Sequence, residues 1–131
     1  MDNNFYYLTT ENILDLYAEL FDFPQQMAED ALLNVDMLES ALASPRNHAL
    51  YEGADIAEQG AHLGFGLAKN HPFRDGNKRT AGLAVHLFLR TNGTSLTCSD
   101  DYLAAWVIAL TLGMSAETFA ACLRSFVAPL P

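Results

Sequence analysis

The stretch from Thr80 to Arg90 limits the possible folds of this chain more than any other. Apart from His86 and the two end residues, it consists of apolar and small side chains. A helix of that composition has no polar face and is stable only when other helices surround it. The sequence therefore predicts a central buried helix, which the remaining segments must cover.

Most of the other segments carry an apolar stripe at helical spacing. The sequence predicts helices over 10–21, over 24–44 as one helix or as two separated at Asn34, and over 54–70, 99–113 and 115–128. Only 44–53, which contains Pro45 and Gly53, lacks such a stripe, and we expect a loop or a short hairpin there. No segment alternates as strands do. The expected fold is an all-α bundle of about six helices.

The segment 54–70 is mostly apolar but contains Gly60, Gly64 and Gly66. Each glycine in a helix interior costs roughly 1 kcal/mol relative to alanine. Close packing against another helix would explain why such small residues occur there, so we expect this helix to approach its neighbours closely.

Composition and charge exclude several classes of protein. A chain of 131 residues suits one domain, expected over 1–131 with a core from about 9 to 127. Its net charge of −9 disfavours nucleic acids and anionic membranes as partners. No apolar run reaches the roughly 18 residues that span a bilayer, and no signal-peptide pattern is present. We therefore expect a cytoplasmic protein. Cys98 and Cys122 lack a disulfide or zinc pattern and are expected to be core thiols.

Polar chemistry gathers just before the apolar helix, in His71-Pro-Phe-Arg-Asp-Gly-Asn-Lys-Arg79. Five of the seven Lys and Arg residues lie between positions 69 and 90, and Asp75 is the one acid in that window. A cationic window this narrow in an acidic chain predicts a pocket for a small anion.

The segment from Gly76 to Arg79 lies where a loop becomes a helix. Free backbone N–H groups at a helix N-terminus bind phosphate, and a glycine allows close approach. Lys78 adds a point charge and Arg79 a bidentate fork. We expect Asp75 to hold Mg²⁺ that bridges phosphate oxygens, and His71 to act as a general base. These groups together predict phosphorus transfer to a hydroxyl, without deciding which phosphorus is attacked.

This motif resembles the signature His-x-Phe-x-Asp/Glu-Gly-Asn-Gly/Lys-Arg of the Fic/Doc family, whose all-α fold suits the helical pattern from about 9 to 127. Typical nucleotidyl transferases of the family carry glycine at the position of Lys78 and a second arginine at that of Gly82. This chain has neither, and is more similar to the Doc branch, the death-on-curing toxins of toxin–antitoxin pairs. A lysine fills the space that a glycine would leave for the α and β phosphates.

The resemblance implies a toxin kinase. Doc proteins present the γ-phosphate of ATP to a threonine of elongation factor Tu, which arrests translation, and an antitoxin chain regulates them. Carried over to this chain, His71 would deprotonate the target hydroxyl and Asp75 would ligate magnesium, while Phe73 would anchor the loop. The phosphates would be held by Gly76, Asn77, Lys78 and Arg79. By position, 44–53 would be the flap that aligns the target segment.

Two other functions stay open on the sequence alone. A nucleotidyl transferase of the same family would move AMP or UMP onto a protein hydroxyl, whereas a binding module would keep the fold without turnover. His62 and His86 lie in apolar helices and are expected to be core or boundary residues. The role of His48 is left open.

Overall fold

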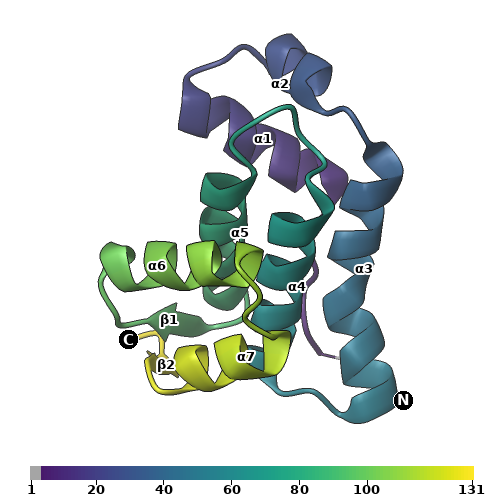
Figure 1. Cartoon of the computed structure of the whole chain (residues 1–131). Helices are drawn as coiled ribbons and strands as arrows, with labels where there is room; N and C mark the ends of the chain where they lie inside the picture. Colours follow the sequence, from purple (N-terminus) through teal and green to yellow (C-terminus); the bar gives the residue numbers. More distant parts are fainter. Residues whose placement is uncertain (1–3) are drawn as a thin grey trace.

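The computed structural model describes residues 4–131 as seven helices and one two-stranded sheet. In chain order the elements are α1 (Thr10–Phe21), α2 (Gln25–Ala31), α3 (Val35–Glu52), α4 (Ile56–Asn70), α5 (Asn77–Thr91), β1 (Thr94–Leu96), α6 (Asp100–Thr111), α7 (Ala116–Arg124) and β2 (Val127–Pro129). Helices α4 and α5 pack side by side in the middle, α3 runs along α4 on one flank, and α6 and α7 cross the lower part of this pair (Figure 1). The predicted all-α fold is confirmed, with seven helices in this range instead of about six.

Helix α5 is the buried centre that its composition predicts. Its buried side chains are Asn77, Thr80, Ala81, Ala84, Val85, Phe88 and Leu89. The side of α5 that faces α6 is less covered by other elements, as the 40% exposure of Leu83 shows. Within residues 4–131, none of the helices combines the length and the apolar composition needed to cross a bilayer.

Polar caps start most of the helices where the sequence places them. Thr9 forms a capping box with Asn12, and the side chains of Ser99 and Ser115 accept hydrogen bonds from the first turns of α6 and α7. Asn34 caps α3 by accepting a hydrogen bond from the Met37 amide. The segment 24–44 therefore contains two helices, and Asn34 is the start of the second one.

The prediction of a loop or hairpin over 44–53 is wrong, because α3 runs unbroken through Pro45 to Glu52. A proline in a helix interior removes one backbone hydrogen bond, which is why it indicated a break. Pro45 is buried, as are Leu38 and Ala41, and α3 packs along α4. This tertiary packing outweighs the local cost, and α3 ends only at Gly53, whose φ of +67° suits the left-handed C-cap.

The C-terminal region also differs from the prediction, because it contains strand pairing. Thr94–Leu96 pairs antiparallel with Val127–Pro129, and Leu96 lies opposite Val127. Each strand has three residues, too few for an alternating pattern to be visible in the sequence. Helix α7 accordingly ends at Arg124 and does not continue to Pro129.

Two of the three glycines of α4 lie at close helix contacts, as predicted. A Cβ atom on Gly64 would lie 2.8 Å from both Val85 and Phe119. A Cβ atom on Gly66 would lie 2.9 Å from the Cβ of Ala41 and 3.0 Å from its Cα. Gly60 differs, because its Cβ would meet Leu89 at an ordinary 3.5 Å.

We therefore expect Gly66→Ala and Gly60→Ala to have opposite effects on stability. Gly66→Ala pushes α4 away from the α3 backbone and should lower the free energy of unfolding by about 1–3 kcal/mol. Gly60→Ala should leave it unchanged or raise it by up to about 1 kcal/mol, because alanine favours the helix. Urea unfolding followed by circular dichroism measures both, and equal values for the two variants would contradict the close α3–α4 contact.

Candidate functional site

The motif residues lie on the loop that joins α4 to α5, at one end of the bundle (Figure 1). His71 is the C-cap of α4 and has a left-handed backbone, with φ of +48°. Asp75 precedes the start of α5, and Lys78 and Arg79 lie in its first turn. The side chains of these four residues are exposed. The structure thus brings the expected base, carboxylate and cations to one solvent-facing end, while their catalytic roles stay predictions.

The side chain of Asn77 holds the loop closed. Its amide oxygen accepts a hydrogen bond from the Phe73 backbone N–H, and its amide nitrogen donates to the Phe73 carbonyl, both at 2.9 Å. The two residues are buried, at 8% and 2% exposure. These two bonds engage the oxygen and one N–H of the side-chain amide, so the loop-closing role of Asn77 is carried by its side chain. Its backbone N–H lies in the first helical turn, where amides lack helical partners and can bind a phosphate.

Tyr17 of α1 contacts the motif loop from outside the loop, at Phe73 and Asp75. Its ring stacks on Phe73, with the centroids 4.2 Å apart and the planes 12° from parallel. Its hydroxyl donates to the Asp75 backbone carbonyl at 3.1 Å and lies 3.4 Å from Oδ1 of the same residue. Burial raises the pKa of Tyr17, and the Asp75 carboxylate raises it further, so the hydroxyl stays protonated as a donor. Phe73 is thus anchored by packing, and Asp75 is positioned from α1.

Phe21, one turn after Tyr17, explains the glycine of the motif. A Cβ atom on Gly76 would overlap the Phe21 ring, and Gly76 also has a φ of +76°. Only glycine satisfies both conditions without strain. The Arg79 guanidinium carbon lies 5.4 Å from the centroid of the same ring, a cation–π contact that orients the side chain.

The chain segment beside the motif loop is 31–34, which consists of the last residue of α2 and the three residues that join α2 to α3. The Arg74 N–H donates to the Ala31 carbonyl at 2.9 Å, and the N–H groups of Leu33 and Asn34 donate to the Pro72 carbonyl at 2.9 and 3.1 Å. The assignment of 44–53 as the flap is therefore wrong, because those residues lie within α3. The segment that borders the motif loop is 31–34, which is shorter than 44–53 and precedes it in the chain.

A cavity of about 490 Å³ opens beside the start of α5. Its lining residues are Leu20, Lys78, Arg79, Gly82, Leu83, His86, Asp100, Leu103, Ala104, Val107 and Ile108. Most of these side chains are apolar, and the cations belong to the first turn of α5. His86 also lines the cavity, and its Nε2 atom lies 3.9 Å from the Asp100 carboxylate. The arrangement can accept a ligand with one anionic end and one flat apolar end.

Sequence reasoning missed Tyr17, Phe21 and the segment 31–34 as parts of this site. The two aromatic residues belong to the apolar stripe of α1, which predicted core packing and nothing more specific. Their contacts are with residues more than fifty positions later in the chain. No local pattern carries that information.

We expect Tyr17→Phe to loosen the loop without unfolding it. The variant keeps the stack on Phe73 but loses the hydrogen bond to Asp75, which should cost about 0.5–1.5 kcal/mol. Urea unfolding measures the loss, and hydrogen exchange at the amides of 74–77 should become faster. Tyr102→Phe is the matched control, because the Tyr102 side chain is 55% exposed and, within 4–131, no hydrogen bond to its hydroxyl is found. An equal effect of both variants would refute the positioning role.

Comparison with known proteins agrees with this geometry. The Fic/DOC family model matches residues 7–89, which include α1 and the motif loop. The chain is also similar to Toxin Doc of Mycolicibacterium smegmatis (strain ATCC 700084 / mc(2)155), with 33% identity over 99 residues, 72% of this chain and 71% of that protein. On both grounds, the chain belongs to the Fic/DOC family.

Proposed function

We propose that the chain is a toxin of the Doc type, which transfers the γ-phosphate of ATP to a hydroxyl of a protein target and is held in check by a cognate antitoxin. Its family and its similarity to Toxin Doc support the class. A threonine of elongation factor Tu is the target that the motif resemblance implies, and its phosphorylation would arrest translation.

The observation that carries the kinase assignment is the pair Lys78 and Gly82, which line the same cavity one helical turn apart. A lysine at the first position fills the space beside the helix end where the α and β phosphates of a nucleotidyl donor would lie. Glycine at the second position leaves the cavity without the further arginine that would bind those phosphates. This combination favours a nucleotide that presents its γ-phosphate to the loop.

The roles of the other residues follow from their places. In the proposed reaction the target oxygen attacks the γ-phosphorus, the bond from that phosphorus to the bridging oxygen breaks, and ADP leaves. His71 accepts the proton of the attacking hydroxyl, which its exposed position at the end of α4 permits. The backbone N–H groups from Asn77 to Arg79 and the Arg79 fork hold the negative phosphate oxygens.

Asp75 fits the magnesium role on its own chemistry. Its carboxylate is exposed, and only Oδ1 has a contact, the long one to the Tyr17 hydroxyl, among the hydrogen bonds found within residues 4–131. Magnesium at nucleotide sites is held by one or two carboxylates together with phosphate oxygens and waters, so a single free carboxylate suffices. When bound, the ion would neutralise charge on the phosphates.

We expect purified protein to transfer label from [γ-³²P]ATP, and not from [α-³²P]ATP, to elongation factor Tu. His71→Ala should lower the initial rate of transfer by about 10²–10⁴-fold, the usual contribution of a general base. Gel autoradiography with equal specific activities measures both. Label from the α position on the target would show nucleotidyl transfer and reject the kinase assignment.

Growth arrest separates catalysis from simple binding. Expression of the wild-type chain should stop growth. His71→Ala should restore growth at equal protein levels, because it removes the expected base. The side chain of His71 is exposed, so its loss removes no core packing. Undiminished arrest by His71→Ala would instead mean a binding module that acts without turnover.

A further inference from the structure

Two histidines and a glutamate meet on the side of the molecule formed by α3 and α4. The rings of His48 and His62 are stacked, with centroids 3.4 Å apart and planes 6° from parallel. The Nδ1 atom of His48 lies 2.7 Å from Oε2 of Glu52, four residues later on the same helix. One ligand atom from each residue lies within 4.8 Å of the other two.

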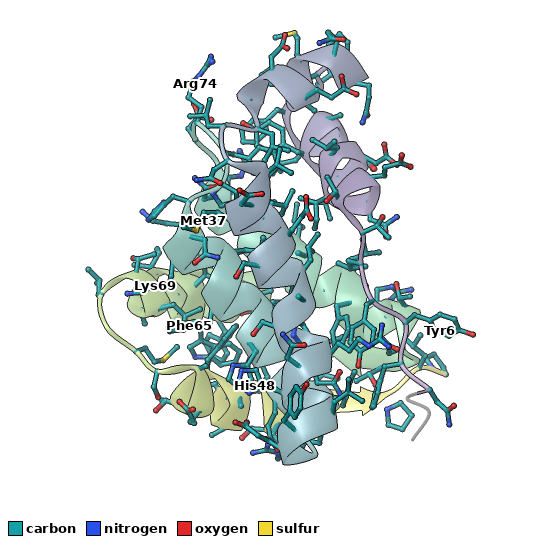
Figure 2. All side chains as sticks on the ribbon, turned by 90° about the vertical axis from the view of Figure 1, so that its right-hand side faces the viewer. Tyr6, Met37, His48, Phe65, Lys69 and Arg74 are labelled. Carbon is teal, nitrogen blue, oxygen red and sulfur yellow. The ribbon has the colours of Figure 1, made fainter. Side chains whose placement is uncertain are left out.

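This cluster is separate from the motif loop. His48 lies toward the lower end of α3, whereas Arg74 of the motif loop is at the top of the molecule (Figure 2). His62 lies in α4 and His71 is the C-cap of that helix, nine residues later, which corresponds to about 13 Å along the axis. The proposed phosphate chemistry does not use any of the three residues.

The electrostatics of the cluster suit a bound cation. Burial lowers the pKa of His62, and the neighbouring His48 lowers it further, so the His62 ring favours the neutral form that coordinates metals. The hydrogen bond from His48 lowers the pKa of Glu52, which keeps that side chain a carboxylate. Glu117 of α7 and Glu58 of α4 also act on His62, although Glu58 pairs with Arg124 at 3.3 Å. The surrounding field is therefore negative.

We propose that His48, Glu52 and His62 bind one Zn²⁺ ion, with water as the remaining ligand. Two imidazole nitrogens and one carboxylate oxygen form a ligand set that suits zinc. In a tetrahedral site with bonds of about 2.0–2.1 Å, donor atoms lie about 3.3–3.5 Å apart, and the donors here already lie within 4.8 Å of one another. Zinc replaces the proton shared by His48 and Glu52, and one ring turns out of the stack so that its lone pair reaches the ion.

Such a site would join α3 to α4, two helices that each have one end at the motif loop. Helix α3 begins directly after the segment 31–34 that borders the loop, and α4 ends at the expected base. A ligand that binds only the folded chain stabilises it in proportion to the logarithm of its concentration. Zinc is thus expected to raise the thermal stability of the chain by binding at this cluster, away from the proposed nucleotide site.

The test is calorimetric titration of the full chain, untagged and treated with chelator, with ZnCl₂ at pH 7.5. The wild type should bind one equivalent and show a higher Tm with zinc. His48→Gln and His62→Gln should each weaken binding at least tenfold and abolish the rise in Tm. His86→Gln is the control variant and should bind zinc as the wild type does. His86 lies near Asp100 in the cavity beside α5, away from the cluster.

Circular dichroism checks that each variant is folded, and the half-exposed His48 and the exposed Glu52 provide variants that do not disturb the core. Glu52→Gln should also weaken zinc binding, and wild-type affinity should fall between pH 7.5 and 5.5 as protons compete for the imidazoles. Absence of binding by the wild type at 100 µM zinc, or unchanged affinity in folded His48→Gln, would overturn the proposal. Equal loss in His86→Gln would place the ion elsewhere and overturn it too.

Discussion

The stack of Tyr17 on Phe73 is the contact on which the functional end of the molecule depends. It fixes the middle of the motif loop against α1, while Asn77 closes the same loop from within through two hydrogen bonds to the Phe73 backbone. Because the loop is held on both sides of Phe73, its polar residues can stay in water and still keep their positions. A loop held only by its exposed side chains would lose that order, and with it the geometry that phosphoryl transfer requires.

The packing of α4 against α5 also holds the motif loop in place, because these helices carry its two ends. The loop begins at the end of α4 and finishes at the start of α5, so the packing of these two helices sets the spacing between the expected base and the amides that we expect to bind phosphate. Gly64 allows α4 to approach Val85 of α5 closely, and the buried face of α5 leaves little room for adjustment. Small and apolar residues far from solvent would therefore serve the proposed chemistry, because they fix where the two helices end.

Much of this could be predicted from the sequence, wherever the information is local. The central apolar helix, the helices predicted over 10–21 and 99–113, and the all-α class follow from composition and spacing within a few residues. What failed depends on distant contacts. Pro45 stays helical in a helix that packs along α4 and buries this residue, and strands β1 and β2 exist only as a pair. Tyr17 in the site, and His48 beside His62, likewise meet residues that no local pattern connects.

We propose that Lys78 and the loop around it orient ATP with its γ-phosphate toward His71. A crystal structure of the chain with Mg²⁺ and an ATP analogue that resists hydrolysis between the β and γ phosphates tests this directly. We expect the γ-phosphate at the start of α5, within reach of the His71 imidazole and next to a metal on Asp75. An α-phosphate in that position, with the β and γ phosphates farther along the helix, would contradict it.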